Sequence, residues 1–177
     1  DIFGEIDLVE EVIRIMGLEN IKSIEPEKNR IKPTLNFYQK HFHLAQRSVA
    51  SKGYFETVTW SFSDENLNDN FKEEIETIKI VNPISSELNV LRNSLYPNLI
   101  FYMEKNFKRG FDDQSLFEIG PVFIGKKPGE QITVVCGLKR QSNKDKMYGQ
   151  IDVFEIKKDL VQTLIELGID KNEFKIE

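Results

Sequence analysis

The sequence is poor in the residues that build several common kinds of site. Its 177 residues include one cysteine, Cys136, two histidines and one tryptophan. A single cysteine excludes an internal disulfide and is typical of a protein from a reducing compartment. No apolar run approaches the roughly 20 residues that a membrane-spanning helix requires, and no signal peptide opens the chain. These absences predict a cytoplasmic protein that contacts no membrane.

Positive charge is also scarce. The chain has 24 basic against 29 acidic residues, a net charge of −5, whereas proteins that wrap nucleic acid in general are basic. Hydrophobic residues make up 40% of the chain and include 13 phenylalanines, enough for one good core. The chain begins with Asp rather than Met, so we expect a piece of a longer protein.

The first 34 residues differ in pattern from the rest. Apolar residues recur at intervals of three and four and predict a helix over about residues 5–16 that ends at Gly17: Ile6, Val9, Ile13 and Met16. Residues 22–34 carry Pro26, Pro33 and many charges without periodicity, as a linker does. The predicted organisation is an N-terminal segment 1–21, a linker 22–34 and a core domain 35–177.

The core domain shows strand patterns in neighbouring groups with longer helices between them. We expect helices over 35–52, 64–71, 95–108 and 152–167, and strands over 55–62, 77–81, 115–124 and 132–138, with a further strand starting at Phe174. Gly120-Pro121 predicts a bend or bulge in the third strand, and residues 125–129 predict a hairpin turn after it. This order predicts an α+β fold, a mainly antiparallel sheet with helices packed on one face.

Carboxylates gather on the N-terminal helix. Asp7, Glu10 and Glu11 are spaced so that they project from one helix face, and Asp1 could fold back toward them. Converging oxygens suit Mg²⁺ or Ca²⁺. The spacing alone nevertheless favours a solvated acidic face, because four acids exceed the one or two carboxylates that usually bind Mg²⁺.

The remaining candidates favour structural roles. His41 and His43 are two residues apart on a helix, so their side chains diverge and cannot share a metal. Cys136 lies inside an apolar strand and is predicted to be a buried thiol. Ser85-Ser86 lacks the glycines of a nucleophile elbow, and residues 125–129 lack the spacing of a phosphate loop. Three basic residues could touch a phosphate backbone, although a solvated loop is favoured: Arg140, Lys144 and Lys146.

Four stretches of the chain together carry a family resemblance. They are DIFGEIDLVEEVIRIMG (1–17), GYFETVTWSF (53–62), NPISSELNVLRNSLYPNL (82–99) and FEIGPVF (117–123). Their order resembles the β subunit of bacterial phenylalanyl-tRNA synthetase over nearly the whole chain, with Met16 and Leu18 as mild departures. The match predicts the end of that subunit's B5 domain (1–21) and most of its class II synthetase-like core domain.

The resemblance implies membership of an α₂β₂ ligase that joins phenylalanine to its tRNA using ATP. In that family the α subunit carries out the chemistry, this part of β packs against α, and tRNA(Phe) is bound by the whole complex. The resemblance also places the family's Mg²⁺ ligands on Asp1, Asp7, Glu10 and Glu11, with a residue of α sharing the ion. Such an ion is expected in the intact subunit and is expected to bind poorly to this piece.

The residue at position 116 favours a non-catalytic domain. Catalytic class II domains carry an arginine two residues before a strand glutamate to bind ATP phosphate, and Leu116 occupies that position before Glu118. Arg92 is therefore expected to serve an interface between domains or subunits. The rival hypotheses are a stand-alone ATP-dependent class II-type enzyme that activates an amino acid or another carboxylate, and an acidic interaction module without an ion.

Overall fold

The computed structural model describes residues 2–26, 34–71, 77–141 and 153–174, and the chain divides into two compact units, Asp1–Thr34 and Leu35–Glu177. In the first unit, helix α1 (Glu5–Met16) and the short 3₁₀ helix η1 (Leu18–Asn20) confirm the predicted N-terminal helix. α1 ends at Gly17, whose φ of 85° suits glycine. None of its residues is buried.

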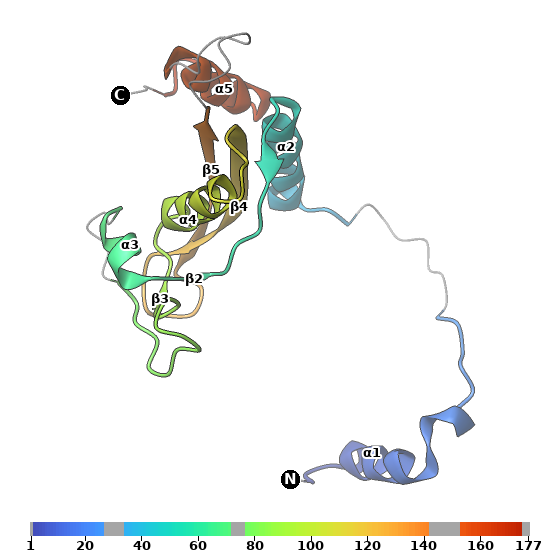
Figure 1. Ribbon diagram of the computed structural model, residues 1–177. Coiled ribbons are helices and arrows are strands. Elements are labelled where there is room, and N and C mark those ends of the chain that lie inside the picture. Colours follow the sequence, from blue (N-terminus) through green and yellow to red (C-terminus); the bar gives the residue numbers. More distant parts are fainter. Residues whose placement is uncertain (1, 27–33, 72–76, 142–152, 175–177) are drawn as a thin grey trace. The chain divides into compact units, whose positions relative to one another are not determined.

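The second unit is built on a three-stranded sheet with the order β1-β4-β5 (Figure 1). β4 (Gln114–Phe123) and β5 (Gln131–Arg140) pair antiparallel over their full length, and the turn 125–129 joins them as predicted. β1 (Phe55–Glu56) runs parallel to β4. A separate antiparallel pair joins β2 (Phe62–Ser63) to β3 (Val90–Leu91). The α+β class is confirmed, but the main sheet is mixed rather than mainly antiparallel.

Two predicted strands are shorter than expected. The stretch 55–62 divides into β1 and β2, because its two ends bond to different segments. The Thr57 amide donates to the carbonyl of Phe117 in β4. The Ser61 carbonyl accepts from the amide of Arg92, which follows β3. The expected strand 77–81 is reduced to one isolated bridge between Lys79 and Val90.

The bulge predicted at Gly120-Pro121 is wrong, because β4 keeps its register with β5 through both residues. A residue's N–H and C=O point to the same side of a strand. The Pro121 carbonyl accepts a hydrogen bond from the Arg92 side chain, so this side of Pro121 faces away from β5, beyond the end of β1. The missing proline N–H therefore costs no ladder hydrogen bond.

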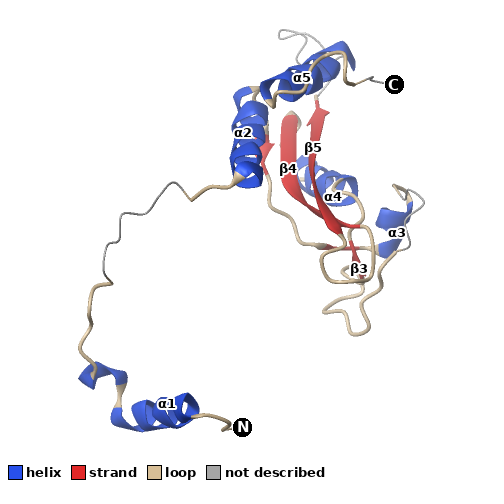
Figure 2. Cartoon of the chain, turned by 180° about the vertical axis from the view of Figure 1, so that it is seen from behind, coloured by secondary structure: helices blue, strands red, loops and turns tan. Residues whose placement is uncertain are grey.

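Helices pack on both faces of the sheet, not on one. α4 (Tyr96–Phe107) covers the face formed by even-numbered residues of β4, with a core of Leu95, Leu99, Met103, Leu116, Val122 and Cys136. The odd-numbered face packs on the segment of α2 (Phe37–Ser51), with Val49, Tyr54 and Phe117 buried together. Figures 1 and 2, opposite views, show α4 in front of these strands and then behind them. Alternation of side chains along a strand produces the two cores.

The other helices follow the predicted positions. α3 (Glu65–Asp69) is capped by Asp64, and α5 (Val153–Glu166) lies within the predicted range 152–167 and contacts α2. Lys144, Lys146, Asp152 and the continuation of the strand predicted from Phe174 lie outside the described residues, as does Asp1. Among the described residues no helix has both the length and the apolarity needed to cross a membrane.

Candidate functional site

The strongest polar centre of the core domain joins Arg92 to Glu118. Glu118 lies in the middle of β4, and Arg92 directly follows β3. The Arg92 backbone is fixed on both sides, because its amide donates to the carbonyl of Ser61 and its carbonyl accepts from the amide of Phe123, each at 3.0 Å. The end of β3 is thereby held between the segment before β2 and the end of β4.

The two side chains form an ion pair that is almost completely shielded from solvent. Arg92 Nη1 lies 2.7 Å from Glu118 Oε1, and the side chains are 2% and 3% exposed. Arg92 Nε donates to the Pro121 carbonyl at 2.9 Å, and Nη1 also donates to the Thr59 hydroxyl at 3.0 Å. The Thr59 hydroxyl in turn donates to Glu118 Oε2 at 2.7 Å. Both carboxylate oxygens therefore have donors inside the protein.

Neighbouring residues close the space around the guanidinium. Asn98, from α4, donates to the Thr59 hydroxyl at 3.1 Å and to the Trp60 carbonyl at 2.7 Å. Gly120 lies directly against Arg92, since a Cβ atom at this glycine would lie 2.5 Å from Nη2. The centre thus connects the 59–61 segment, α4 and β4 through hydrogen bonds.

This arrangement leaves neither charge available to a ligand. Leu116, two residues before Glu118, is buried in the apolar core against α4. The only guanidinium beside Glu118 in the described residues is that of Arg92, and it is already paired. The expectation that Arg92 serves an interface is wrong, because its side chain is enclosed within one unit.

The predicted metal ligands do not form a site in the described part of the chain. Asp7 Oδ2 accepts from the amides of Phe3 and Gly4, each at 2.8 Å, and these bonds lower the pKa of Asp7 below its usual value. Glu11 is paired with Arg14 at 2.6 Å. No group of three or more potential ligands converges among the described residues, and Asp1, the fourth predicted ligand, lies outside them.

The residues set aside on sequence grounds have structural partners. His41 Nδ1 lies 2.9 Å from the Phe37 carbonyl, and His43 Nδ1 lies 3.3 Å from Gln46 Oε1.

Cys136 is buried as predicted, and this burial raises the pKa of its thiol to about 12. Ser85 begins a turn in which its carbonyl accepts from the Leu88 amide. The only basic residue of the 140–150 loop that the structure describes, Arg140, stacks on Phe107.

A second polar cluster, around Lys139, was not predicted from the sequence. Lys139 Nζ lies 2.7 Å from both Glu155 and Asp159 of α5, and it also lies 4.8 Å from the centre of the Tyr54 ring. Burial opposes the charge of Lys139, but the hydrogen bonds that it donates to these carboxylates raise its pKa above the ordinary value. Desolvation raises the pKa of Tyr54 to about 12. The one sequence signal was a lysine directly after an apolar strand.

Glu166 extends this cluster at the far end of α5. It accepts from Ser48 and Lys52 of the α2 segment, with Lys52 Nζ at 2.9 Å. The Ser48 hydrogen bond and then the Lys52 hydrogen bond lower the pKa of Glu166. α5 is therefore attached to the sheet and to α2 through charged and polar groups.

Comparison with solved structures assigns the fold to the class II aminoacyl-tRNA synthetases. The chain is similar to PylSc, a pyrrolysyl-tRNA synthetase from Desulfitobacterium hafniense, with a TM-score of 0.56 at 14% identity over 76% of this chain and 46% of that one. A second structure of pyrrolysyl-tRNA synthetase from this organism gives a TM-score of 0.54 at 15% identity over 75% of this chain and 47% of that one.

The particular family follows from the sequence. Residues 21–177 match the model of the phenylalanyl tRNA synthetase beta chain CLM domain, and the chain belongs to this family. It is 36% identical to the phenylalanine–tRNA ligase beta subunit of Paramagnetospirillum magneticum, over 99% of this chain, and 36% identical to that of Bartonella henselae, over all of it. The chain spans 23% of the length of each of these relatives.

Proposed function

We propose that this chain is a non-catalytic docking domain of the ligase that attaches phenylalanine to its tRNA with ATP. In this proposal it packs on the catalytic α subunit, and tRNA(Phe) is bound by the assembled complex. The observation that carries the proposal is the closed Arg92–Glu118 ion pair, which occupies both charges near the position where a class II synthetase would hold a nucleotide.

Opening this centre for ATP would be costly. A nucleotide phosphate requires an uncompensated cation, and Leu116 supplies only an apolar surface. Moving Arg92 toward a ligand would leave Glu118 buried without its partner, and breaking a buried pair in this way costs about 3–5 kcal/mol. The rival hypothesis of a stand-alone ATP-dependent enzyme is therefore not favoured.

ATP–pyrophosphate exchange with phenylalanine tests the absence of catalysis. The chain alone is expected to give no exchange, and the complete α/β ligase, assayed in parallel, provides the positive control. Sustained exchange by the purified chain would refute the proposal.

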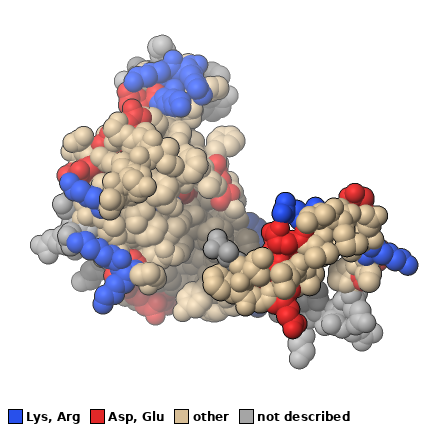
Figure 3. All heavy atoms as spheres, turned by 90° about the horizontal axis from the view of Figure 1, so that it is seen from below, with Lys and Arg blue, Asp and Glu red and all other residues tan. Residues whose placement is uncertain are grey.

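A surface suited to docking lies along α2 and β5. An apolar groove of about 750 Å³ is lined by Tyr38 and Phe42 of α2, Val135 of β5 and Ile119 of the neighbouring strand β4. Tyr38 is 81% exposed and Val135 is 45% exposed. Broad areas of the surface in Figure 3 carry neither acidic nor basic side chains. Exposed apolar surface of this extent is typical of protein interfaces, and we propose that the α subunit covers this groove.

Co-purification with a matching α subunit tests this surface. Tyr38→Asp is expected to weaken association at least tenfold, because it places a charge in the apolar groove, whereas an acid in the first turn of α2 leaves the helix stable. Val81→Asp is the matched control, since Val81 is fully exposed and does not line the groove. Equal retention of α by both variants would contradict the assignment of the groove.

Mg²⁺ at Asp1, Asp7, Glu10 and Glu11 stays a prediction for the intact subunit. Asp7 and Glu11 already have partners in the described residues, so a site would require Asp1 and groups from outside this piece. The docking proposal does not depend on the ion.

A further inference from the structure

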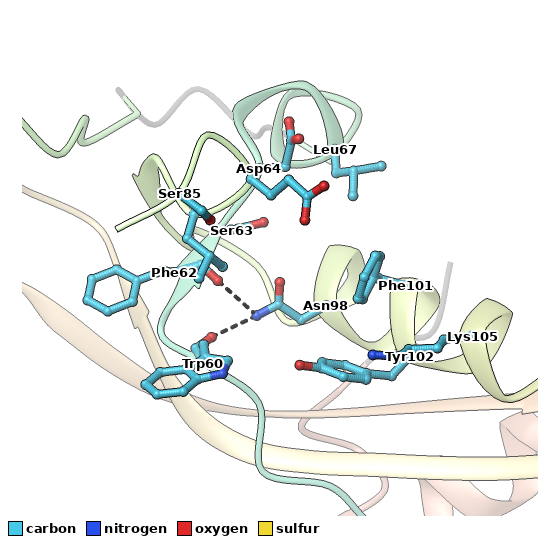
Figure 4. Close-up of a pocket in the computed structure, with 12 residues that line it drawn as sticks. Trp60, Phe62, Ser63, Asp64, Leu67, Ser85, Asn98, Phe101, Tyr102 and Lys105 are labelled. Atoms are coloured by element: carbon cyan, nitrogen blue, oxygen red, sulfur yellow. Dashed lines mark hydrogen bonds between the residues drawn. The ribbon is translucent and has the colours of Figure 1, made fainter. Parts of the chain in front are cut away.

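A separate pocket lies beside the Arg92–Glu118 centre. It has a volume of about 360 Å³ and is formed by the end of the 59–62 segment, the start of α3, the 85–88 turn and α4 (Figure 4). This volume falls in the range of sites for small organic ligands. Neither the docking groove nor the ion pair uses this space.

The walls of the pocket are aromatic and open to solvent. Trp60 is 62% exposed and Phe101 is 43% exposed, and Phe62 and Tyr102 line the same space. Figure 4 shows Trp60 and Tyr102 on one side of Asn98, with Phe101 nearby. Aromatic side chains provide large contact areas for an apolar group, so the walls fit a ligand with an apolar or aromatic body.

One buried polar group in the lining lacks a partner. Ser63 is 2% exposed, and its hydroxyl has no hydrogen-bond partner among the described residues. Asn98, beside it in the lining, uses its amide nitrogen on the carbonyls of Trp60 and Phe62. Buried polar groups are normally satisfied, so the Ser63 hydroxyl points to a polar ligand.

The pocket also carries charges of both signs that do not neutralise each other. Asp64 and Glu87 contribute carboxylates, and Lys105 of α4 contributes an ammonium group. Among the described residues Lys105 forms no ion pair, and its one recorded contact is with the ring of Tyr102, at 5.9 Å. Asp64 uses Oδ1 to cap α3 by accepting from the Asn66 amide. Separate acidic and basic groups in one cavity favour a ligand that itself carries both charges.

We propose that this pocket binds the zwitterion of a free amino acid with an apolar side chain. The ammonium group of the ligand lies at Asp64 and Glu87, its carboxylate lies at Lys105, and its side chain packs on Trp60 and Phe101. This site is distinct from catalysis and from docking, so a chain that catalyses no exchange still binds the ligand.

Fluorescence gives a direct test, because Trp60 is the only tryptophan of the chain and lines the pocket. The 177-residue chain is titrated with L-phenylalanine, L-leucine, 2-phenylethylamine and 3-phenylpropanoate. We expect saturable changes with both amino acids and at least tenfold weaker binding of the two compounds that lack one charge, since each lost charge-assisted hydrogen bond is worth about a factor of ten or more. Absence of saturation with the amino acids, or equal affinity for all four compounds, would overturn the proposal.

Two variants locate the ligand charges. Lys105→Met is expected to weaken L-phenylalanine binding at least tenfold without changing the affinity for 2-phenylethylamine, which has no carboxylate. Asp64→Asn removes the opposite charge while asparagine still caps α3. Lys108→Met is the control. Lys108 lies three residues after Lys105 at the end of α4, but it pairs with Glu104 and does not line the pocket. Unchanged binding by Lys105→Met, or an equal loss in Lys108→Met, would refute the assignment.

Discussion

The two polar clusters of the core domain are built from similar ion pairs but differ in depth. In the inner cluster both partners, Arg92 and Glu118, are at most 3% exposed. In the outer cluster Lys139 is 6% exposed, while its partners Asp159 and Glu155 are 16% and 47% exposed. In the inner pair, burial removes water as an alternative partner, so each charge depends on the other. The carboxylates of the outer pairs keep contact with solvent.

This difference separates two tasks. The inner cluster ties β4 to two segments that precede it in the sequence, the 59–61 segment and the end of β3. The outer cluster attaches α5, whose apolar residues stay largely exposed, for example Phe154 at 78% and Leu160 at 47%. The comparison predicts that losing one charge destabilises the whole domain in the first case and only the attachment of α5 in the second.

Arg92→Met should have the largest effect. It leaves the Glu118 carboxylate buried with Thr59 as its remaining donor, and we expect a loss of about 3–5 kcal/mol in the free energy of unfolding. Urea denaturation followed by circular dichroism measures this loss. The double variant Arg92→Met/Glu118→Leu should recover most of it, because no uncompensated charge remains. If Arg92→Met lowers the free energy of unfolding by less than about 1 kcal/mol, the depth of burial does not distinguish the two clusters.

The inner cluster shows how far sequence reasoning reached. The burial of Glu118 could be expected from its place in an apolar strand, because that signal is local. The partner of Glu118 could not be predicted, since Arg92 lies 26 residues away and meets it only after β3 and β4 are placed. The bulge at Pro121 was predicted from proline's missing N–H, and it failed because β1 ends before reaching this position.

The outer cluster shows a second feature that the sequence could not predict, the way in which α5 docks. The apolar stripe of α5, which includes Leu160 and Leu164, predicted the helix correctly but not which face meets the sheet. Asp159 and Glu166 bind the core segments instead. Asp159 contacts Tyr54 and Lys139, and Glu166 contacts Ser48, more than 100 positions away in the sequence. Periodicity reports the presence of a helix, whereas its docking depends on partners that tertiary structure supplies.

Lys139→Met should have a smaller, local effect. The cation that links β5 to α5 disappears, but Asp159 keeps Tyr54 as a donor and both carboxylates reach solvent. We expect a loss of about 1–2 kcal/mol. Hydrogen exchange of the α5 amides should accelerate while exchange in β4 stays unchanged. Lys157→Met, on the same helix, serves as the control, and acceleration throughout the domain would show that the outer cluster also supports the core.

Acid should release the end of α5 before the core unfolds. The folded-state pKa of Glu166 lies below its ordinary value, so its contribution is complete above the unfolded pKa and is lost as the pH falls through the lower, folded value. The protection factors of the amides in the last turn of α5 should therefore decrease as the pH falls below the ordinary glutamate pKa of 4.5. Glu166→Gln should lose this pH dependence, and an unchanged profile in that variant would assign the transition to another group.

The smallest effect is expected in the N-terminal unit, where the carboxylates are exposed. Asp7 Oδ2 holds the amides of Phe3 and Gly4, so an ion that took this oxygen would have to release the cap of α1. For this reason we expect Mg²⁺ to produce no saturable shift in the amide resonances of residues 5–16. The titration extends to about 10 mM, because even weak protein sites for divalent cations fill below that concentration. Asp7→Ala should instead reduce the helicity of α1 without any ion, because the cap is lost. A saturable Mg²⁺ shift that Asp7→Ala abolishes would show that exposed carboxylates of this piece converge on a cation and that the metal site does not depend on the rest of the subunit.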